Sequence, residues 1–377
     1  MAVSSPYEPL DKSRQQIRLM SLLPTDDESI TCIVEIFEIE STPAYRALSY
    51  EWGSTERMHT ITINGCPKQI RWNLFDFLEI YRRRQEQGWI WIDQLCIDQD
   101  SLVERNHQVG LMEYIFRGAQ ETLVWLGHDP DDGVALEAFR CVAEDTPKWS
   151  DAEQAAIRRF LCLTYWSRHW IAQEIMLSKT VLLLHGTDEL KWEIVCRNLY
   201  SLSSNCAGAN SSTELPLQTF VGFTLKWSKD FDRLDSWAMQ GYASFAEQSL
   251  CQDPRDKIYG TRSLFPTSLR MPVDYAMSAR NLYCKMINLW AQDEQARGSS
   301  PFHFLVNCEI LCHGMGLTTR RLGYENMISE YESYCKEKGL EHKTLTLSWD
   351  TPECFQDLVD FIEYYLLDAD EESASSA

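Results

Sequence analysis

Five short apolar runs, separated by segments with helical periodicity, constrain the fold of this chain more than any other feature. The runs lie at residues 30–39 (ITCIVEIFEI), 45–50 (YRALSY), 89–92 (WIWI), 122–126 (TLVWL) and 181–185 (VLLLH). Continuous apolar runs of this length are typical of strands buried on both faces. The alternation predicts an α/β fold, with a three-layer core in which helices cover both faces of a mostly parallel sheet.

Turn and capping residues add local detail. Asn64-Gly65 favours a tight turn and predicts a small β-hairpin inserted before the first helix. Asn73 is predicted to cap that helix. Ser150 and Glu153 have the spacing of a capping box and predict a helix that begins there.

The composition changes after about residue 200 and predicts a division of the chain. Residues 203–216 are rich in Ser, Asn, Gly and Ala, and later stretches have helical periodicity. The last ten residues have either acidic or small side chains. The predicted parts are an N-terminal extension (1–29), an α/β core (30–200), a linker (201–216), a mainly helical C-terminal region (217–367) and a disordered acidic tail (368–377).

Charge and hydropathy exclude several classes of function. The chain has 35 Lys and Arg against 56 Asp and Glu, a net charge of -21, which disfavours nucleic-acid binding and attraction to anionic lipid. No apolar run is long enough to span a membrane, and the first residues lack the pattern of a signal peptide. We therefore expect a cytoplasmic protein without a membrane span, in which the 13 cysteines are reduced.

Two arrangements of Cys and His are candidate chemical sites. Cys308, Cys312 and His313 are close in sequence but lack a second pair at zinc-ligand spacing, so no metal site is expected. Cys96 and His107 would form a hydrolase pair only if they met in space, and no oxyanion-hole signature accompanies them.

Four blocks resemble the signature of the fungal heterokaryon-incompatibility (HET) domain and the segment that often follows it. They are 45–53 (YRALSYEWG), 91–99 (WIDQLCIDQ), 166–174 (WSRHWIAQE) and, downstream, 253–260 (DPRDKIYG). Several blocks in the right order are far more specific than one short motif. One departure is Phe116, where the family pattern has Tyr, and the two rings fill nearly the same volume.

The resemblance implies a role in nonself recognition and programmed cell death when incompatible hyphae fuse. A remote similarity to TIR domains, at the ALSY strand and at Trp170 with Glu174, implies a TIR-like or flavodoxin-like core. In TIR domains that cleave NAD the corresponding glutamate is catalytic. The alternative function is therefore an NAD nucleosidase, an NAD glycohydrolase with Glu174 as its carboxylate and NAD as substrate rather than cofactor. Here Ile171 replaces the Cys of the TIR segment.

The candidate pocket combines residues of the three HET blocks at the carboxyl ends of strands, where open α/β sheets bind ligands. Its predicted residues are Ser49, Tyr50, Trp52, Gly53, Trp91, Asp93, Arg168 and Trp170, with Glu174 as the candidate catalytic group.

Each of these residues also has a structural interpretation. Glu174 would then pair with Arg168, the tryptophans would belong to the core, Asp93 would cap a helix, and Gly53 would serve a turn. Under that interpretation the protein is a signalling module that associates with itself or with a partner protein.

Overall fold

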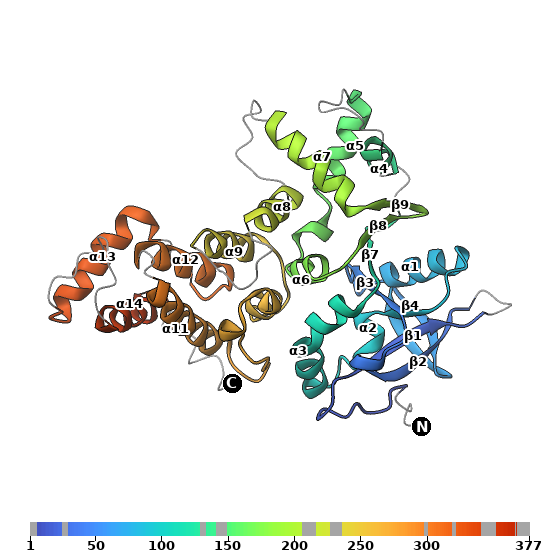
Figure 1. Ribbon diagram of the computed structural model, residues 1–377, viewed down its shortest axis with the longest axis horizontal. Coiled ribbons are helices and arrows are strands. Elements are labelled where there is room, and N and C mark those ends of the chain that lie inside the picture. The colour runs from blue at the N-terminus through green and yellow to red at the C-terminus, as the bar shows by residue number, and fades with distance from the viewer. Residues whose placement is uncertain are drawn as a thin grey trace. The chain divides into compact units, whose positions relative to one another are not determined.

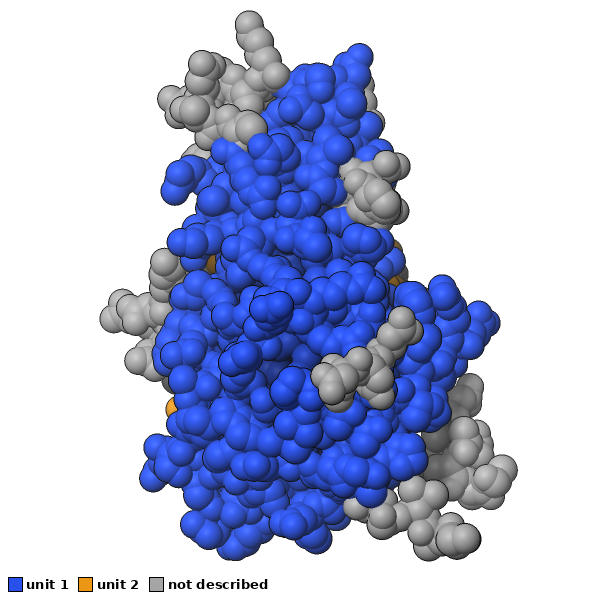
Figure 2. Space-filling view, turned by 90° about the vertical axis from the view of Figure 1, so that its right-hand side faces the viewer, with its two compact units in different colours: residues 1–221 blue, residues 222–377 orange. Residues whose placement is uncertain are grey.

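The computed structural model divides the chain into two compact units, residues 1–221 and 222–377, which are described separately and coloured separately in Figure 2. The described residues are 6–24, 29–128, 133–140, 149–205, 216–226, 236–297, 301–318, 322–340, 352–365 and 367.

The first unit is built on one sheet with helices around it (Figure 1). Its strands are β1 (Gln16–Leu22), β2 (Thr31–Glu38), β3 (Tyr45–Tyr50), β4 (Met58–Ile63), β5 (Cys66–Arg71), β6 (Trp89–Trp91), β7 (Glu121–Trp125), β8 (Val181–His185) and β9 (Asp188–Lys191). Its helices are α1 (Trp72–Arg83), α2 (Asp93–Cys96), α3 (Leu102–Gly118), α4 (Gly133–Arg140), α5 (Asp151–Leu161), α6 (Ile171–Met176) and α7 (Trp192–Asn205).

The sheet is mixed, and the prediction of a mostly parallel sheet was wrong. The strand order is β5-β4-β2-β1-β6-β3-β7-β8-β9. Only the central block β6-β3-β7-β8 is continuously parallel, whereas β1 runs antiparallel to both β2 and β6, and β9 runs antiparallel to β8. The apolar runs indicate only the central strands and β2. β1 and β9, which add antiparallel pairs beyond the predicted β4–β5 hairpin, have no continuous apolar run.

The predicted hairpin and the predicted capping box are confirmed. Asn64 and Gly65 have φ of 49° and 78°, which is the positive-φ pair that a tight hairpin turn between β4 and β5 requires. Ser150 and Glu153 form both hydrogen bonds of a capping box at the start of α5. Asn73, in contrast, does not cap α1. The helix begins one residue earlier, and the Asn73 side chain accepts a hydrogen bond from Trp125 Nε1 at 3.0 Å.

Helices cover both faces of the parallel block. Phe77 of α1 packs edge-on against Trp125 of β7, with ring centroids 5.8 Å apart. On the opposite face, Tyr45 of β3 donates its hydroxyl hydrogen bond to the Ile115 carbonyl oxygen of α3, at 2.6 Å. Side chains alternate along a strand and Tyr50 pairs with Trp125, so Tyr45 and Trp125 lie on opposite faces. The parallel block is therefore the buried middle layer of this unit.

The second unit is helical, as the sequence predicts for the C-terminal region. Its helices are α9 (Ser236–Gln248), α10 (Asp256–Tyr259), α11 (Ala279–Arg297), α12 (Pro301–Gly314), α13 (Gly323–Glu337) and α14 (Pro352–Tyr365), and α8 (Pro216–Lys226) contains the boundary between the units. Helices α9 and α12 approach closely, because a Cβ at Gly314 would lie only 2.8 Å from the Glu247 Cα.

The downstream block at 253–260 has a structural role in this unit. The buried Lys257 ammonium donates to the carbonyl oxygens of Ala246, at 2.5 Å, and Ser249, at the end of α9. Tyr242 of α9 donates in return to the Lys257 carbonyl oxygen at 2.8 Å. The block therefore satisfies helix-end carbonyls that would otherwise be buried without donors.

The chain divisions predicted from composition differ from the structure at β1 and at α7, and some of them lie outside the described residues. Strand β1 lies within the stretch predicted as an N-terminal extension and is hydrogen-bonded into the sheet. The predicted linker starts inside α7, its residues 206–215 lie outside the described part of the chain, and the predicted tail also lies outside it. Among the described residues, no helix combines the length and apolar character needed to cross a membrane.

Candidate functional site

Side chains of the three HET-like blocks meet at the carboxyl end of the parallel strands. Ser49, at the end of β3, donates a hydrogen bond to the Glu174 carboxylate of α6. Trp52, just after β3, donates from Nε1 to Asp93 Oδ2 at 2.7 Å, and Asp93 is the first residue of α2, after β6. Segments more than 100 residues apart in the sequence therefore converge through direct hydrogen bonds.

The centre of this cluster is an ion pair between Glu174 and Arg168. The two guanidinium nitrogens lie 3.0 and 3.1 Å from the two carboxylate oxygens, and the Glu174 side chain is only 7% exposed. Such a bidentate pair is both strong and directional. The burial of Arg168 disfavours its charge, but Glu174, Tyr165 and Asp93 together outweigh that effect and raise the pKa of the guanidinium above its ordinary value.

Tyr165 completes the cluster and was not predicted. Its hydroxyl lies 2.5 Å from Ser49 Oγ, and the Arg168 guanidinium lies 5.5 Å from its ring centroid. Burial, reinforced by the Glu174 charge, raises the pKa of the Tyr165 phenol well above its usual range. The phenol therefore stays protonated and acts as a neutral hydrogen-bonding group. Its only sequence signal was its position immediately before the third block.

Asp93 forms a second, connected centre. It accepts hydrogen bonds from Trp52 Nε1 and from the backbone N–H of Gln94, the latter at 2.7 Å. Burial raises the pKa of the Asp93 carboxyl to about 6, with the nearby Glu174 charge adding to the rise and Arg168 opposing it. A carboxyl that titrates near neutral pH is suited to proton exchange, although structural networks also perturb acids in this way.

The remaining predicted pocket residues occupy different environments. Tyr50 is buried and donates from its hydroxyl to Gln94 Oε1 at 3.2 Å, a partner that was not predicted. Trp91 belongs to the core, where it is 1% exposed and packs edge-on against Phe116 at 5.6 Å. Trp91 thus has no surface to offer a ligand.

Gly53 and Trp170 lie at the margins of the cluster. Gly53 is exposed with φ of 75°, and its carbonyl oxygen accepts from Arg71 at 2.7 Å, which agrees with a role in a turn. Trp170 is half-buried, and its carbonyl oxygen accepts the first hydrogen bonds of α6 from Gln173 and Glu174. Trp52 is also half-buried, and the Arg71 guanidinium lies 5.0 Å from its ring centroid.

The proposed Cys96 and His107 pair does not form. The Cys96 thiol is buried against the backbone of Ile90 and Ile92, and burial raises its pKa to about 12. The His107 ring instead contacts the Arg14 carbonyl oxygen at 3.1 Å. Within the described residues, no group of three or more His, Cys, Asp or Glu side chains is arranged to hold a metal ion.

The geometry limits what this cluster can do chemically. Both Glu174 oxygens accept hydrogen bonds from Arg168, and one of them also accepts from Ser49. The carboxylate is therefore poorly placed to stabilise positive charge that develops on a substrate unless these contacts rearrange. Asp93, Trp52 and Arg168 are half-buried, and a ligand at this edge would reach these three side chains first.

Comparisons with known proteins agree with the blocks that converge here. Residues 45–174 match the family described as Heterokaryon incompatibility protein (HET). The chain carries a HET domain. Over 133 residues it is 37% identical to the heterokaryon incompatibility protein 6, OR allele, of Neurospora crassa. That similarity spans 31% of this chain and 19% of the Neurospora protein. No solved structure matches the chain.

The HET match corresponds to only part of the sheet. It begins at the first residue of β3 and ends within α6, and therefore includes β3 to β7. Strands β1 and β2 before it, and β8 and β9 after it, are hydrogen-bonded to the matched strands or to each other. Arg18 of β1 is buried and forms a salt bridge with Glu104 of α3. It also donates a 3.2 Å hydrogen bond to the carbonyl oxygen of Cys96, in the second block (91–99). A residue outside the match therefore helps to hold that block in place.

Proposed function

We propose that this protein acts in heterokaryon incompatibility in a fungus, where its HET domain signals nonself recognition and leads to programmed cell death. The observation that carries the proposal is the convergence of the three HET blocks. Ser49, Asp93 and Glu174, one from each block, belong to one electrostatically connected cluster at one end of the parallel strands.

The contacts of the cluster favour a signalling module over an enzyme. The Ser49 hydroxyl ties α6 to the end of β3, and the Glu174–Arg168 pair ties α6 to the segment before it, which makes this edge a rigid platform. A rigid edge with the half-buried Trp52 and Trp170 beside it suits contact with a partner protein or with a second copy of the chain. The net charge of -21 argues against a nucleic-acid partner.

A cytoplasmic location is part of the proposal. The ten cysteines whose state the structure describes are all free thiols. Most of them are buried or half-buried, and such thiols persist in a reducing compartment.

NAD cleavage with Glu174 as the catalytic carboxylate is the second candidate. The specific observation in its favour is position, because Ser49, Asp93 and Glu174 lie at the strand ends where α/β sheets bind ligands. The four parallel strands also follow the order second-first-third-fourth along the chain, as in doubly wound flavodoxin-like sheets. The Arg168 pair is the observation against it, since that pair must open before Glu174 can reach a sugar ring.

One experiment separates the two candidates. Wild type, Glu174→Gln and the control Glu56→Gln, a substitution at an exposed loop residue, are expressed in a fungal host while viability and NAD level are followed together. Purified proteins are incubated with NAD in parallel, and nicotinamide release is measured. The Gln variant keeps the size and one acceptor of Glu174, so it removes the charge with less damage to folding than Ala.

The outcomes are distinct. Loss of viability with unchanged NAD, and no nicotinamide release, supports the signalling module. Loss of viability with NAD consumption that Glu174→Gln abolishes and Glu56→Gln does not would establish the enzyme. If the wild type leaves viability unchanged in hosts of every tested incompatibility genotype, the proposed role in cell death is wrong.

A further inference from the structure

A pocket of about 360 Å³ lies in the first unit, away from the Ser49–Glu174 cluster. It is formed between the end of α1 and the strands β3, β7 and β8. Arg46, near the start of β3, pairs in register with Glu121 at the start of β7, and both line the pocket. The pocket therefore lies toward the amino ends of the parallel strands, whereas Ser49 lies near the carboxyl end. Its volume falls in the range of about 300–1,000 Å³ that small-molecule sites occupy.

The floor of the pocket is apolar. Phe77 and Ile80 come from α1, and Leu123, Leu182 and Leu184 come from the strands. Leu123 and Leu182 pair directly across β7 and β8, so their side chains point to the same face as α1. Such a floor favours a ligand with a compact hydrocarbon or aromatic body.

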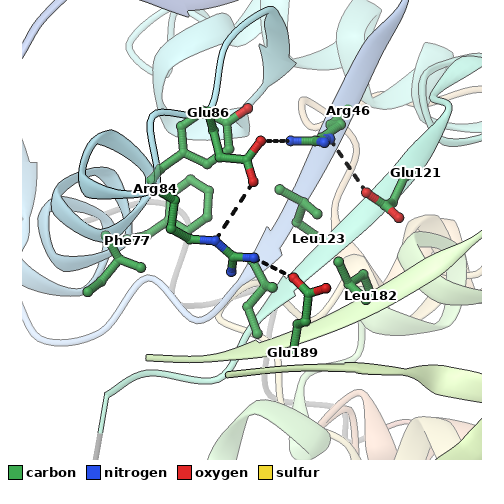
Figure 3. A pocket seen from close by; sticks show the side chains of 11 residues that line it. Arg46, Phe77, Arg84, Glu86, Glu121, Leu123, Leu182 and Glu189 are labelled. Atoms are coloured by element: carbon green, nitrogen blue, oxygen red, sulfur yellow. Dashed lines mark hydrogen bonds and ion pairs between the residues drawn. The ribbon is translucent and has the colours of Figure 1, made fainter. Parts of the chain in front are cut away.

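The rim is a continuous chain of charged residues, shown in Figure 3. It runs from Glu121 to Arg46 (3.5 Å), to Glu86 (2.7 Å), to Arg84 (3.7 Å) and to Glu189. Three carboxylates face two guanidinium groups, so the rim carries one net negative charge. Each arginine already lies between two carboxylates, and an incoming anion would compete with them.

Arg84 Nη1 is buried without a hydrogen-bond partner, and among the three rim carboxylates Glu121 is the one that accepts no hydrogen bond from an arginine. Its side chain is 25% exposed, and its contact with Arg46 at 3.5 Å does not have hydrogen-bond geometry, whereas Glu86 and Glu189 both accept hydrogen bonds from arginine. A partly buried carboxylate beside an apolar floor is completed by a cation that donates hydrogen bonds.

From this arrangement we propose that the pocket binds a small amphipathic amine, with its ammonium group on Glu121 and its apolar body on the leucine floor. The proposal is independent of the incompatibility function, because none of the residues that line this pocket belongs to the Ser49–Glu174 cluster.

The test is isothermal titration calorimetry on the full chain with three probes of similar size. They are 2-phenylethylamine (cationic at pH 7), 2-phenylethanol (neutral) and 3-phenylpropanoate (anionic). The amine is expected to bind at least tenfold more tightly than the alcohol, and the carboxylate is expected not to bind. Equal affinity for amine and alcohol, a preference for the carboxylate, or no heat from any probe at millimolar concentration would each overturn the proposal.

Two variants locate the site. Glu121→Gln is expected to weaken amine binding at least fivefold and to leave alcohol binding unchanged, whereas the control Glu38→Gln, at a surface-paired glutamate on β2, changes neither. Leu182→Trp fills the floor and is expected to abolish binding of both probes. If Leu182→Trp fails to fold, Glu121→Gln alone decides, and unchanged amine affinity in that variant refutes the assignment.

Discussion

The Glu174–Arg168 pair offers the sharpest test of how the HET domain is held together, through the substitution Glu174→Ala. The pair is bidentate, with contacts of 3.0 and 3.1 Å, and the side chains are 7% and 18% exposed. Removing the carboxylate leaves Arg168 charged and mostly buried, and it also removes the acceptor of the Ser49 hydroxyl. Breaking a buried pair on one side costs about 3–5 kcal/mol.

The assay is urea and thermal unfolding of the full chain, followed by tryptophan fluorescence. Trp166 contacts Tyr165 with ring centroids 4.9 Å apart, so its emission reports on this region. A loss of about 3–5 kcal/mol corresponds to a fall of roughly 6–20 °C in the melting temperature of a unit of this size. The control Glu113→Ala breaks a more exposed helical pair with Arg117 and is expected to cost under about 0.5 kcal/mol.

A double-mutant cycle with Arg168→Met isolates the pair itself. The two single substitutions are expected to be non-additive, with a coupling energy of about 1–3 kcal/mol. If Glu174→Ala changes the unfolding free energy by less than about 1 kcal/mol, or if the coupling is zero, the pair does not stabilise α6 against the segment that precedes it. The result also bears on mechanism, because an inactive Glu174→Ala protein that is largely unfolded says nothing about catalysis.

Three further predictions concern titration, helix ends and close packing. Because the Asp93 pKa is raised to about 6, its contribution to stability is present below the unfolded-state pKa near 3.8 and is lost as pH rises through about 6. Unfolding free energies measured between pH 4 and 7 should therefore fall more for wild type than for Asp93→Asn, and parallel profiles would contradict the assignment. Lys257→Met leaves buried carbonyl oxygens without their donor and should lower the unfolding free energy of the second unit by about 2–4 kcal/mol. The control Lys285→Met, at an exposed lysine, should change it little. Equal melting temperatures for the two variants would refute the capping role of Lys257. Gly314→Ala should lower the unfolding free energy by about 1–3 kcal/mol, because the added Cβ would lie 2.8 Å from backbone atoms of α9. Gly110→Ala, where no atom lies within 4 Å of the added Cβ, should stabilise α3 by about 0.5–1 kcal/mol. Calorimetry that shows the same sign for both variants would rule out this packing argument.

Local features of the fold were predictable because they depend on neighbouring residues. The central strands were recognised from their apolar runs, the hairpin from Asn64-Gly65, and the capping box from Ser150 and Glu153. In each case the pattern and the interaction that it predicts lie within a few residues of the same segment. The HET blocks were likewise recognised from contiguous residues, and they identified the three segments that meet at the sheet edge.

The sheet topology and the partners within the cluster were decided by tertiary structure. The polar strand β9 and the strand β1 gave no long apolar run, and their places in the sheet depend on hydrogen bonds to distant strands. Asn73 has the residue type of a helix cap, but it accepts from Trp125, 52 residues away. Tyr165 and Gln94 carry no signal of their own until the fold places them beside Ser49 and Tyr50.

Periodicity and short motifs are local properties of the chain, and they were sufficient to predict the α/β class, the helical C-terminal region and the three segments that form the cluster. The folded chain was needed to show that the sheet is mixed, that Glu174 contacts both Arg168 and Ser49, and that a charged pocket lies toward the other end of the strands. Those features depend on which distant side chains share a buried space, where charge and hydrogen bonding must be satisfied together.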